Sequence, residues 1–281
     1  MKIIAVIGAG TMGSGIAQVA AEAGFTVIMR DIEEKFVERG LAVLEKNLGR
    51  AVAKGKRSQA DVDAVRSRVS GTTRLEDLSD ADFVIEAIVE NMALKKELYE
   101  KLDALCKKEA VLASNTSGLS ITEMAAATKR PQKVVGMHFF NPVPVMRLVE
   151  VIRGFDTDDE TFELTMALSR KMGKEPIAVN EAPLFAVNRI LVPMINEAAF
   201  VLMEGVASAE DIDRGMMLGA NHPIGPLALA DLVGLDVLLA VMETLYNETA
   251  DSKYRPCPLM RKLVRAGHFG RKSGRGFYDY S

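Results

Sequence analysis

The sequence has few cysteines, no long apolar run and almost no net charge. Its two cysteines, Cys106 and Cys257, stand alone without a C-x-x-C pair, so neither a disulfide framework nor a zinc site is predicted, and no metal site is expected. No apolar stretch is long enough to cross a bilayer. The formal net charge is −3, from 35 basic and 38 acidic residues. We therefore expect neither nucleic acid nor a membrane surface as the main partner.

The N-terminus has none of the features of a secretory signal. Met1 and Lys2 lead directly into a strand-like apolar run, whereas a signal peptide has a basic segment, an apolar segment and a cleavage site. Together with the unpaired cysteines, this predicts a reducing, cytoplasmic setting. Hydrophobic residues make up 48% of the 281 positions, enough for one large domain or two smaller ones with a sizeable core.

A glycine-rich turn follows the first strand-like run, residues 2–7. The turn reads GAGTMG, which is G-x-G-x-x-G, and a helical pattern begins directly after it. In this context Gly8 permits a tight turn, Gly10 lets the backbone approach a pyrophosphate, and Gly13 allows close packing of helix on strand. The start of the helix adds amide groups and the positive end of its dipole. We predict a dinucleotide site that includes Gly8, Gly10, Thr11, Met12 and Gly13.

Asp31 follows the second strand-like run, residues 25–29, about 20 positions beyond Gly10. An acidic residue at this place accepts hydrogen bonds from the adenine ribose hydroxyls and repels a 2′-phosphate. It therefore favours NAD(H) over NADP(H). The adjacent Arg30 weakens that preference, so the sequence leaves the ratio between the two cofactors open.

Strand and helix patterns alternate from residue 2 to about residue 140, which is typical of a Rossmann-like, doubly wound α/β sheet. Strand signals then stop near residues 180–184, and only helical patterns follow. We predict a first domain at 1–183, with a helical hairpin insertion near 33–69, and an all-helical second domain at 184–281. A small helical domain usually buries its apolar faces against a partner, which predicts a homodimer or a larger homo-oligomer. The helices expected after the boundary are 187–204, 208–219, 227–246 and 258–266.

Ligands of such sheets bind beyond the carboxyl ends of the strands. The residues that follow the predicted strand ends should therefore share one crevice. They are Gly8, Asp31, Glu90, Ser117 and His138.

His138 lies at the end of the apolar run 134–137. A turn with two prolines leads to a second run, 148–152, that has Glu150 in its middle, and such a turn can bring the two side chains together. A carboxylate beside a histidine fixes its tautomer, orients the ring and stabilises the imidazolium. The alternative is a satisfied core histidine beside a strand charge, but the predicted crevice favours a catalytic His138. The other histidines, His222 and His268, are interpreted as structural.

Basic residues recur along the helix predicted at residues 33–54. Lys46, Arg50 and Lys54 share one face at intervals of four, and Lys56 and Arg57 follow. A solvated basic face is the usual meaning of such a run. A landing site for a substrate phosphate is the alternative, and the residues alone leave both open.

Seven motifs in this order over the whole chain resemble a known family. They are GAGTMGSGIA, EAIVEN, ASNTSGLSIT, GMHFFNPVPVMRLVEVI, VNRIL, LGANHPIGPLALAD and GRKSGRGFYDY. The chain resembles the short-chain L-3-hydroxyacyl-CoA dehydrogenases, most of all the bacterial 3-hydroxybutyryl-CoA dehydrogenases. The resemblance implies NAD(H)-dependent interconversion of (S)-3-hydroxybutyryl-CoA and acetoacetyl-CoA in butyrate or fatty acid metabolism.

The resemblance also implies a role for each matching residue. His138 becomes the catalytic acid and base with Glu150 as its partner, while Ser117 and Asn188 donate hydrogen bonds to the substrate's hydroxyl and thioester oxygens. The basic residues that match the family's CoA phosphate site are Arg50, Lys54 and Lys56. The cofactor-binding residues that it adds are Glu90, Lys95, Asn115, Ser117, Asn141 and Lys272.

The sequence departs from the family pattern at two places. Gly118 follows Ser117 where the family usually has serine, and Leu184 stands where the family's EAPGF motif has glycine. If the backbone there has a positive φ, Leu184 introduces strain near the helix that carries Asn188. Two other functions stay open: a non-catalytic NAD-binding protein of the same fold, and a dehydrogenase of free 3-hydroxy acids. The sequence does not determine acyl chain length, physiological direction or regulation.

Overall fold

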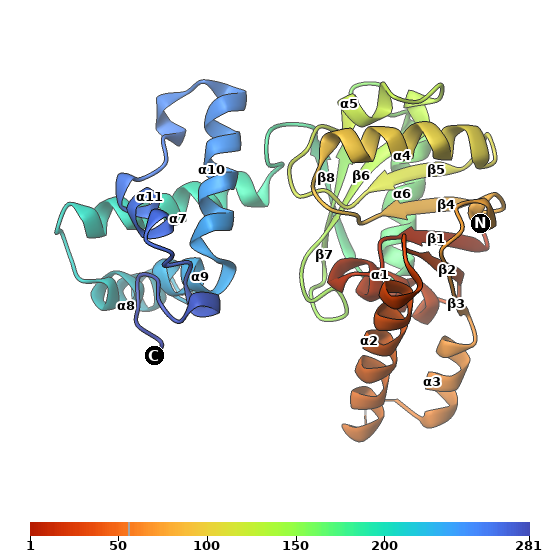
Figure 1. The fold of residues 1–281 in the computed structure, drawn as a ribbon, viewed down its shortest axis with the longest axis horizontal. Coiled ribbons are helices and arrows are strands. Elements are labelled where there is room, and N and C mark those ends of the chain that lie inside the picture. The colour runs from red at the N-terminus through yellow and green to blue at the C-terminus, as the bar shows by residue number, and fades with distance from the viewer. Residues whose placement is uncertain (56) are drawn as a thin grey trace. The chain divides into compact units, whose positions relative to one another are not determined.

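The computed structural model describes residues 1–55 and 57–281. They form two compact units, Met1–Ala182 and Pro183–Ser281. Figure 1 shows strands and helices in the first unit and helices in the second. Within the described ranges, none of the helices has the length and apolar character of a membrane span.

The first unit is built on a sheet with the strand order β3-β2-β1-β4-β5-β6-β7-β8. Strands β1 to β6 are parallel, β7 is antiparallel to β6, and β8 is parallel to β7. This confirms the predicted Rossmann-like sheet and adds a reversed pair at one edge. The strands are β1 (Ile3–Ile7), β2 (Thr26–Arg30), β3 (Val69–Thr72), β4 (Phe83–Glu86), β5 (Val111–Ser114), β6 (Val134–Phe139), β7 (Leu148–Arg153) and β8 (Glu175–Asn180).

Helices cover both faces of this sheet. Apolar side chains of α1, α2, α3 and α6 join alternate strand residues in one continuous core cluster. Helix α5 packs against β6, and α4 packs against α5, so these two lie on the other face. In Figure 1, α2 and α3 extend side by side away from the sheet. The helices of this unit are α1 (Thr11–Glu22), α2 (Glu34–Ala53), α3 (Gln59–Arg66), α4 (Met92–Leu105), α5 (Ile121–Ala125) and α6 (Asp159–Lys171).

The two-residue period of the strands decides which side chains point toward α4 and α5. In β6, Val135, Met137 and Phe139 belong to the core cluster with α1 and α6, so His138 points to the opposite face. The same alternation places one polar side chain from each of β4, β5 and β7 on that face. The residues of β4 and β5 are the last of their strands, and the residue of β7 lies opposite His138. These residues are Glu86, Ser114 and Glu150.

The second unit has one helix break that the sequence analysis did not predict. The prediction of a single helix at 227–246 is wrong, because Gly234 has φ +108° and separates two helices. Residues other than glycine rarely adopt that conformation, and a Cβ at this position would lie 3.0 Å from Asp236 Oδ1 and Lys272 Nζ. The helices are α7 (Val187–Met203), α8 (Ala209–Gly219), α9 (Pro226–Val233), α10 (Leu235–Thr249) and α11 (Pro258–Arg265).

Two buried aspartates of the second unit anchor helix α9 and the C-terminal segment. Asp213 of α8 accepts hydrogen bonds from the amides of Leu227 and Ala228 at the start of α9, and from the Tyr278 hydroxyl. Asp231 accepts from the amides of Phe277 and Tyr278. Burial and the hydrogen bond to Asp213 raise the pKa of Tyr278. Both carboxylates thus compensate for their burial by accepting several hydrogen bonds.

Asp82 fastens the start of β1 to the start of β4, and its loss has a defined pH signature. The Lys2 amide donates to Asp82 Oδ2 at 2.6 Å and holds the pKa of this carboxyl at about 2, with help from Ile3 and Lys107. Asp82→Asn is therefore expected to lower the free energy of unfolding by roughly 2 kcal/mol at neutral pH. Because the pKa is depressed on folding, this contribution is complete above the unfolded value, 3.8, and is lost as the pH falls toward 2.

Urea unfolding at about pH 7 and about pH 2.5 measures this difference. The exposed Asp80 in the same turn is the matched control, because Asp80→Asn removes a charge without removing these amide contacts. An equal loss for Asp82→Asn at both pH values would contradict the assignment.

Candidate functional site

The glycine turn has the shape that a dinucleotide requires. Gly8 has φ +101°, and a Cβ there would lie 2.4 Å from Ala87 O, while a Cβ on Gly13 would lie 1.7 Å from Gly8 O. A Cβ on Gly10 would meet no atom within 4 Å, so open space borders this position. Helix α1 begins at Thr11, and no described side chain caps its N-terminus. The amides of this helix are therefore available for a pyrophosphate, and the turn fits NAD(H).

A cleft of about 790 Å³ lies beside this turn. Its lining residues include Gly8, Gly10, Asp31, Val89, Leu94 and Leu98. Asp31 Oδ2 accepts from the Ala9 amide at 2.7 Å, which ties the end of β2 to the glycine turn. The cleft thus joins the predicted ribose acceptor to the predicted pyrophosphate site.

His138 and Glu150 form the pair that the sequence predicts. They are directly opposite each other in the antiparallel ladder of β6 and β7, and His138 Nδ1 lies 2.8 Å from Glu150 Oε2. His138 is 5% exposed and Glu150 is fully buried. A buried carboxylate at this distance fixes the ring orientation and favours a proton on Nδ1. The ring also lies against Phe140, with 4.5 Å between the centroids.

The loop after β5 lies beside this pair. The Phe139 amide, next to His138, donates to Asn115 Oδ1 at 2.9 Å. The Ser117 amide donates to Glu90 Oε1 at 2.8 Å. These bonds join the loops after β4 and β5 to the end of β6. Of the five residues predicted to share one crevice, Gly8 and Asp31 line the 790 Å³ cleft, whereas Glu90, Ser117 and His138 are not among its lining residues. Asn141 follows in the turn after β6 and is exposed.

Lys95 is held between two carboxylates. Its side chain is fully buried, with Nζ 2.6 Å from Glu86 Oε1 and 3.3 Å from Glu90 Oε2. Glu86 was not among the predicted site residues, although it interrupts the apolar strand DFVIEAI, where a carboxylate must find a partner. Lys95 has the helical spacing of the buried Leu98, Tyr99 and Leu102, which is a second signal of burial. Burial and the charge of Glu86 raise the pKa of Tyr99.

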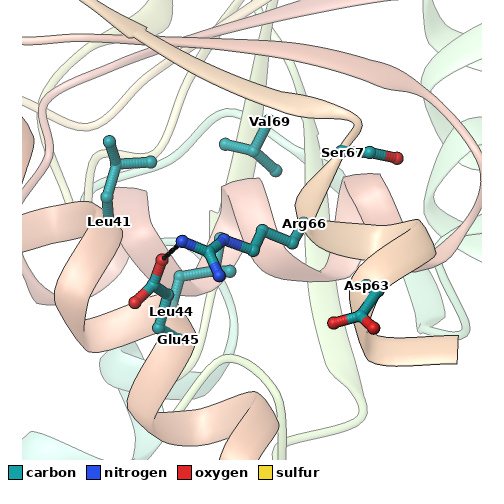
Figure 2. Close-up of a pocket in the computed structure, with 7 residues that line it drawn as sticks. All are labelled: Leu41, Leu44, Glu45, Asp63, Arg66, Ser67 and Val69. Atoms are coloured by element: carbon teal, nitrogen blue, oxygen red, sulfur yellow. Dashed lines mark ion pairs between the residues drawn. The ribbon is translucent and has the colours of Figure 1, made fainter. Parts of the chain in front are cut away.

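The basic face of α2 is exposed at Arg50, and Lys54, which directly follows the helix, is exposed as well. Neither residue forms an ion pair with a described residue, while Lys56, the third predicted phosphate contact, lies outside the described residues. A separate cleft of about 390 Å³ lies between α2, α3 and β3. In this cleft Arg66 forms an ion pair with Glu45 at 2.8 Å, which Figure 2 shows. The wall of the cleft contains the apolar side chains Leu41, Leu44 and Val69.

The second unit contains the remaining predicted site residues. Asn188 is the second residue of α7 and is half-buried. Lys272 Nζ forms an ion pair with Asp236, 2.6 Å from Oδ1. Their proposed contacts with substrate and cofactor stay predictions.

Leu184 has the positive φ that the sequence analysis considered, at 61°. The residue is also 3% exposed and belongs to the apolar core of the second unit. The left-handed conformation costs about 1–2 kcal/mol, whereas truncating a buried leucine costs about 2–5 kcal/mol. The free energy that Leu184 gains by packing is therefore larger than the cost of its backbone conformation, so the leucine stabilises the second unit on balance.

The relative stabilities of an alanine and a glycine variant at Leu184 test whether the backbone there is strained. Leu184→Ala is expected to be less stable than Leu184→Gly by about 1 kcal/mol, because only glycine relieves the strain. Leu238, which is equally buried within helix α10, should show the ordinary order, with glycine worse than alanine by about 1 kcal/mol. Urea unfolding of the four variants measures both differences, and the ordinary order at both sites would refute strain at Leu184.

A dinucleotide turn at the end of β1, an acidic residue at the end of β2 and a histidine–carboxylate pair on β6 and β7 together define a two-unit, nicotinamide-dependent dehydrogenase. Residues 3–182 match the family model described as "3-hydroxyacyl-CoA dehydrogenase, NAD binding domain", and residues 185–280 match the corresponding C-terminal domain. The chain belongs to the 3-hydroxyacyl-CoA dehydrogenase family.

Similar proteins extend over the whole chain. A probable 3-hydroxybutyryl-CoA dehydrogenase of Bacillus subtilis is 58% identical, with 100% of this chain and 98% of the relative covered. The 3-hydroxybutyryl-CoA dehydrogenase of Clostridioides difficile is 55% identical, with 99% of both covered. The crystal structure of the (S)-3-hydroxybutyryl-CoA dehydrogenase of Ralstonia eutropha is 53% identical, has a TM-score of 0.98, and matches over 100% of this chain and 99% of that chain.

Proposed function

We propose that this protein interconverts (S)-3-hydroxybutyryl-CoA and acetoacetyl-CoA with NAD(H). The observation that carries the proposal is the buried His138–Glu150 pair, which lies at the carboxyl end of the same sheet as the dinucleotide turn. The names of relatives that cover the chain end to end support the same reaction.

The residues of this site suggest how a proton is handled. In the oxidative direction, His138 takes the proton of the C3 hydroxyl through Nε2, while Nδ1 stays on Glu150 and the carboxylate stabilises the imidazolium. In the reductive direction His138 returns that proton to the C3 oxygen. NAD(H), when bound, supplies the acceptor or donor of hydride. Ser117 and Asn188 are proposed to donate hydrogen bonds to the substrate oxygens.

Cofactor recognition is proposed to begin at the glycine turn. Gly8, Gly10 and Gly13 with Thr11 and Met12 hold the pyrophosphate at the start of α1, and Asp31 accepts from the adenine ribose. This acidic residue supports NAD(H) rather than NADP(H). The other proposed contacts are Glu90, Lys95, Asn115, Ser117, Asn141 and Lys272.

The exposed basic face of α2 is proposed to bind CoA phosphates. Lys54→Glu is expected to raise the KM for acetoacetyl-CoA about 10-fold, because a repulsive charge replaces an attractive one at an ionic contact. The KM for a short thioester analogue that lacks the nucleotide should not change. Lys108→Glu, at an exposed lysine between α4 and β5, is the control for a general change of charge. Equal effects on both substrates would contradict a phosphate site.

The experiment that tests the proposed reaction compares two substrates. NADH oxidation is measured with acetoacetyl-CoA and, at the same concentration, with free acetoacetate. Rapid turnover of the thioester alone is the expected result. Turnover of both would favour a dehydrogenase of free acids, and NADH binding without turnover would favour a non-catalytic binding protein.

The helical second unit is proposed to bind substrate and to form a homodimer or larger homo-oligomer. Large apolar side chains of this unit are exposed, among them Val206 at 70% and Leu218 at 75%, and such surfaces often mark interfaces. A cytoplasmic location is also proposed, since Cys106 and Cys257 are both free thiols and a reducing compartment keeps thiols in that state.

A further inference from the structure

A fully buried ion pair lies beneath the proposed active-site loop. Glu86 ends β4, Lys95 lies in the first turn of α4, and neither side chain is exposed. Glu86 Oε2 accepts from the Ser114 hydroxyl at 2.7 Å, and Oε1 accepts from the Ile88 amide at 2.7 Å. Burying two charges costs free energy that apolar residues of the same size would not require. A role in positioning neighbouring residues therefore explains this ion pair better than a contribution to stability does.

Lys95 connects this buried carboxylate to a partly exposed one. Its Nζ lies 3.3 Å from Glu90 Oε2, and the Glu90 side chain is 43% exposed. Glu90 Oε1 in turn accepts from the Ser117 amide at 2.8 Å and from the Thr116 hydroxyl at 2.5 Å. A glutamate in a surface loop otherwise samples several rotamers. The ammonium group holds Glu90 in the one orientation that secures the backbone of Ser117.

The same loop is also tied to the strand that carries His138. The Asn115 amide donates to Glu86 O at 2.7 Å, and Asn115 Oδ1 accepts from the Phe139 amide at 2.9 Å. Glu86 therefore supports both ends of the segment between Asn115 and Ser117: its backbone directly, and its side chain through Lys95 and Glu90.

We propose that Glu86 and Lys95 are positioning residues that place Ser117 relative to His138 by way of Glu90. The inference rests on the proposed contact of Ser117 with the substrate.

Lys95→Met removes the ammonium group at nearly constant volume. The expected result is a fall in kcat/KM for acetoacetyl-CoA of roughly 10- to 100-fold, because a small misplacement of a contact residue has that effect. The variant Glu86→Gln/Lys95→Met replaces the buried charges with a neutral pair. It should regain thermal stability and keep the low kcat/KM, because Glu90 still lacks its partner. Recovery of both stability and rate would overturn the proposal.

Non-additivity tests the route through Glu90. Glu90→Gln should lower kcat/KM, and adding Lys95→Met to it should lower kcat/KM no further. If the double variant instead loses the product of the two single fold-losses, the two residues act independently and the route from Lys95 through Glu90 is refuted. Arg130→Met is the matched control. Arg130 forms a buried ion pair with Asp103, which lies in α4 like Lys95, at 2.7 Å. Arg130→Met should lower the melting temperature while kcat/KM is unchanged.

Ser117→Ala separates this inference from the proposed function. If Ser117→Ala leaves kcat/KM unchanged, the role of Ser117 fails, and the proposal about Lys95 fails with it. If Ser117→Ala lowers kcat/KM while Lys95→Met behaves like Arg130→Met, only the positioning role is refuted.

Discussion

Replacing His138 with glutamine is expected to lower kcat for acetoacetyl-CoA reduction by about 10²- to 10⁴-fold, the usual contribution of a positioned acid–base group. The ring lies against Glu150, with Nδ1 2.8 Å from the carboxylate, and glutamine cannot exchange a proton at the C3 oxygen. Steady-state kinetics measure the loss. NADH binding, followed by fluorescence titration, should persist because the glycine turn lies on β1 and α1.

His222→Gln is the matched control for this substitution, since His222 lies in the second unit between α8 and α9. It should leave kcat within a small factor of the wild type. Unchanged turnover in His138→Gln, or an equal loss in both variants, would remove His138 from the mechanism.

Glu150→Gln is expected to lower kcat by roughly 100-fold, within the range for acid–base groups. The amide has the volume of the carboxylate and can still accept a hydrogen bond from Nδ1, so the ring stays in place. It lacks the negative charge that stabilises the imidazolium, and this charge is especially effective because Glu150 is fully buried. Kinetics in both reaction directions measure the effect.

Glu175 is the control for Glu150. It lies on the edge strand β8, where it forms an exposed ion pair with Arg147, and exposed pairs contribute little. Glu175→Gln should leave kcat unchanged. A Glu150→Gln variant with full activity would show that the carboxylate only fills space.

The strand pairing of the site was predictable because its signals are local. Two apolar runs joined by a short turn with two prolines form a hairpin, and the two-residue period decides which side chains face each other across it. His138 and Glu150 accordingly lie opposite each other. The capping box of Ser58 and Asp61 is a second local feature, since it depends on residues only three positions apart.

The helix expected at 227–246 shows where local reasoning failed. Its apolar pattern continues across Gly234, so periodicity predicted one helix. The break occurs where Gly234 adopts a positive φ. A Cβ at this position would crowd Asp236 and Lys272, and Lys272 is far away in the sequence.

By itself, the sequence determined the dinucleotide turn, the alternation of strands and helices, and the histidine–carboxylate pair. Each depends on spacing within a short segment, where backbone geometry limits the possible arrangements. Only the tertiary structure decided which way Lys95 points and which carboxylates it joins. A charged side chain on an apolar helix face can reach a ligand or a buried partner. In the fold, the start of α4 brings Lys95 to Glu86 at the end of β4, and Nζ lies 2.6 Å from Oε1.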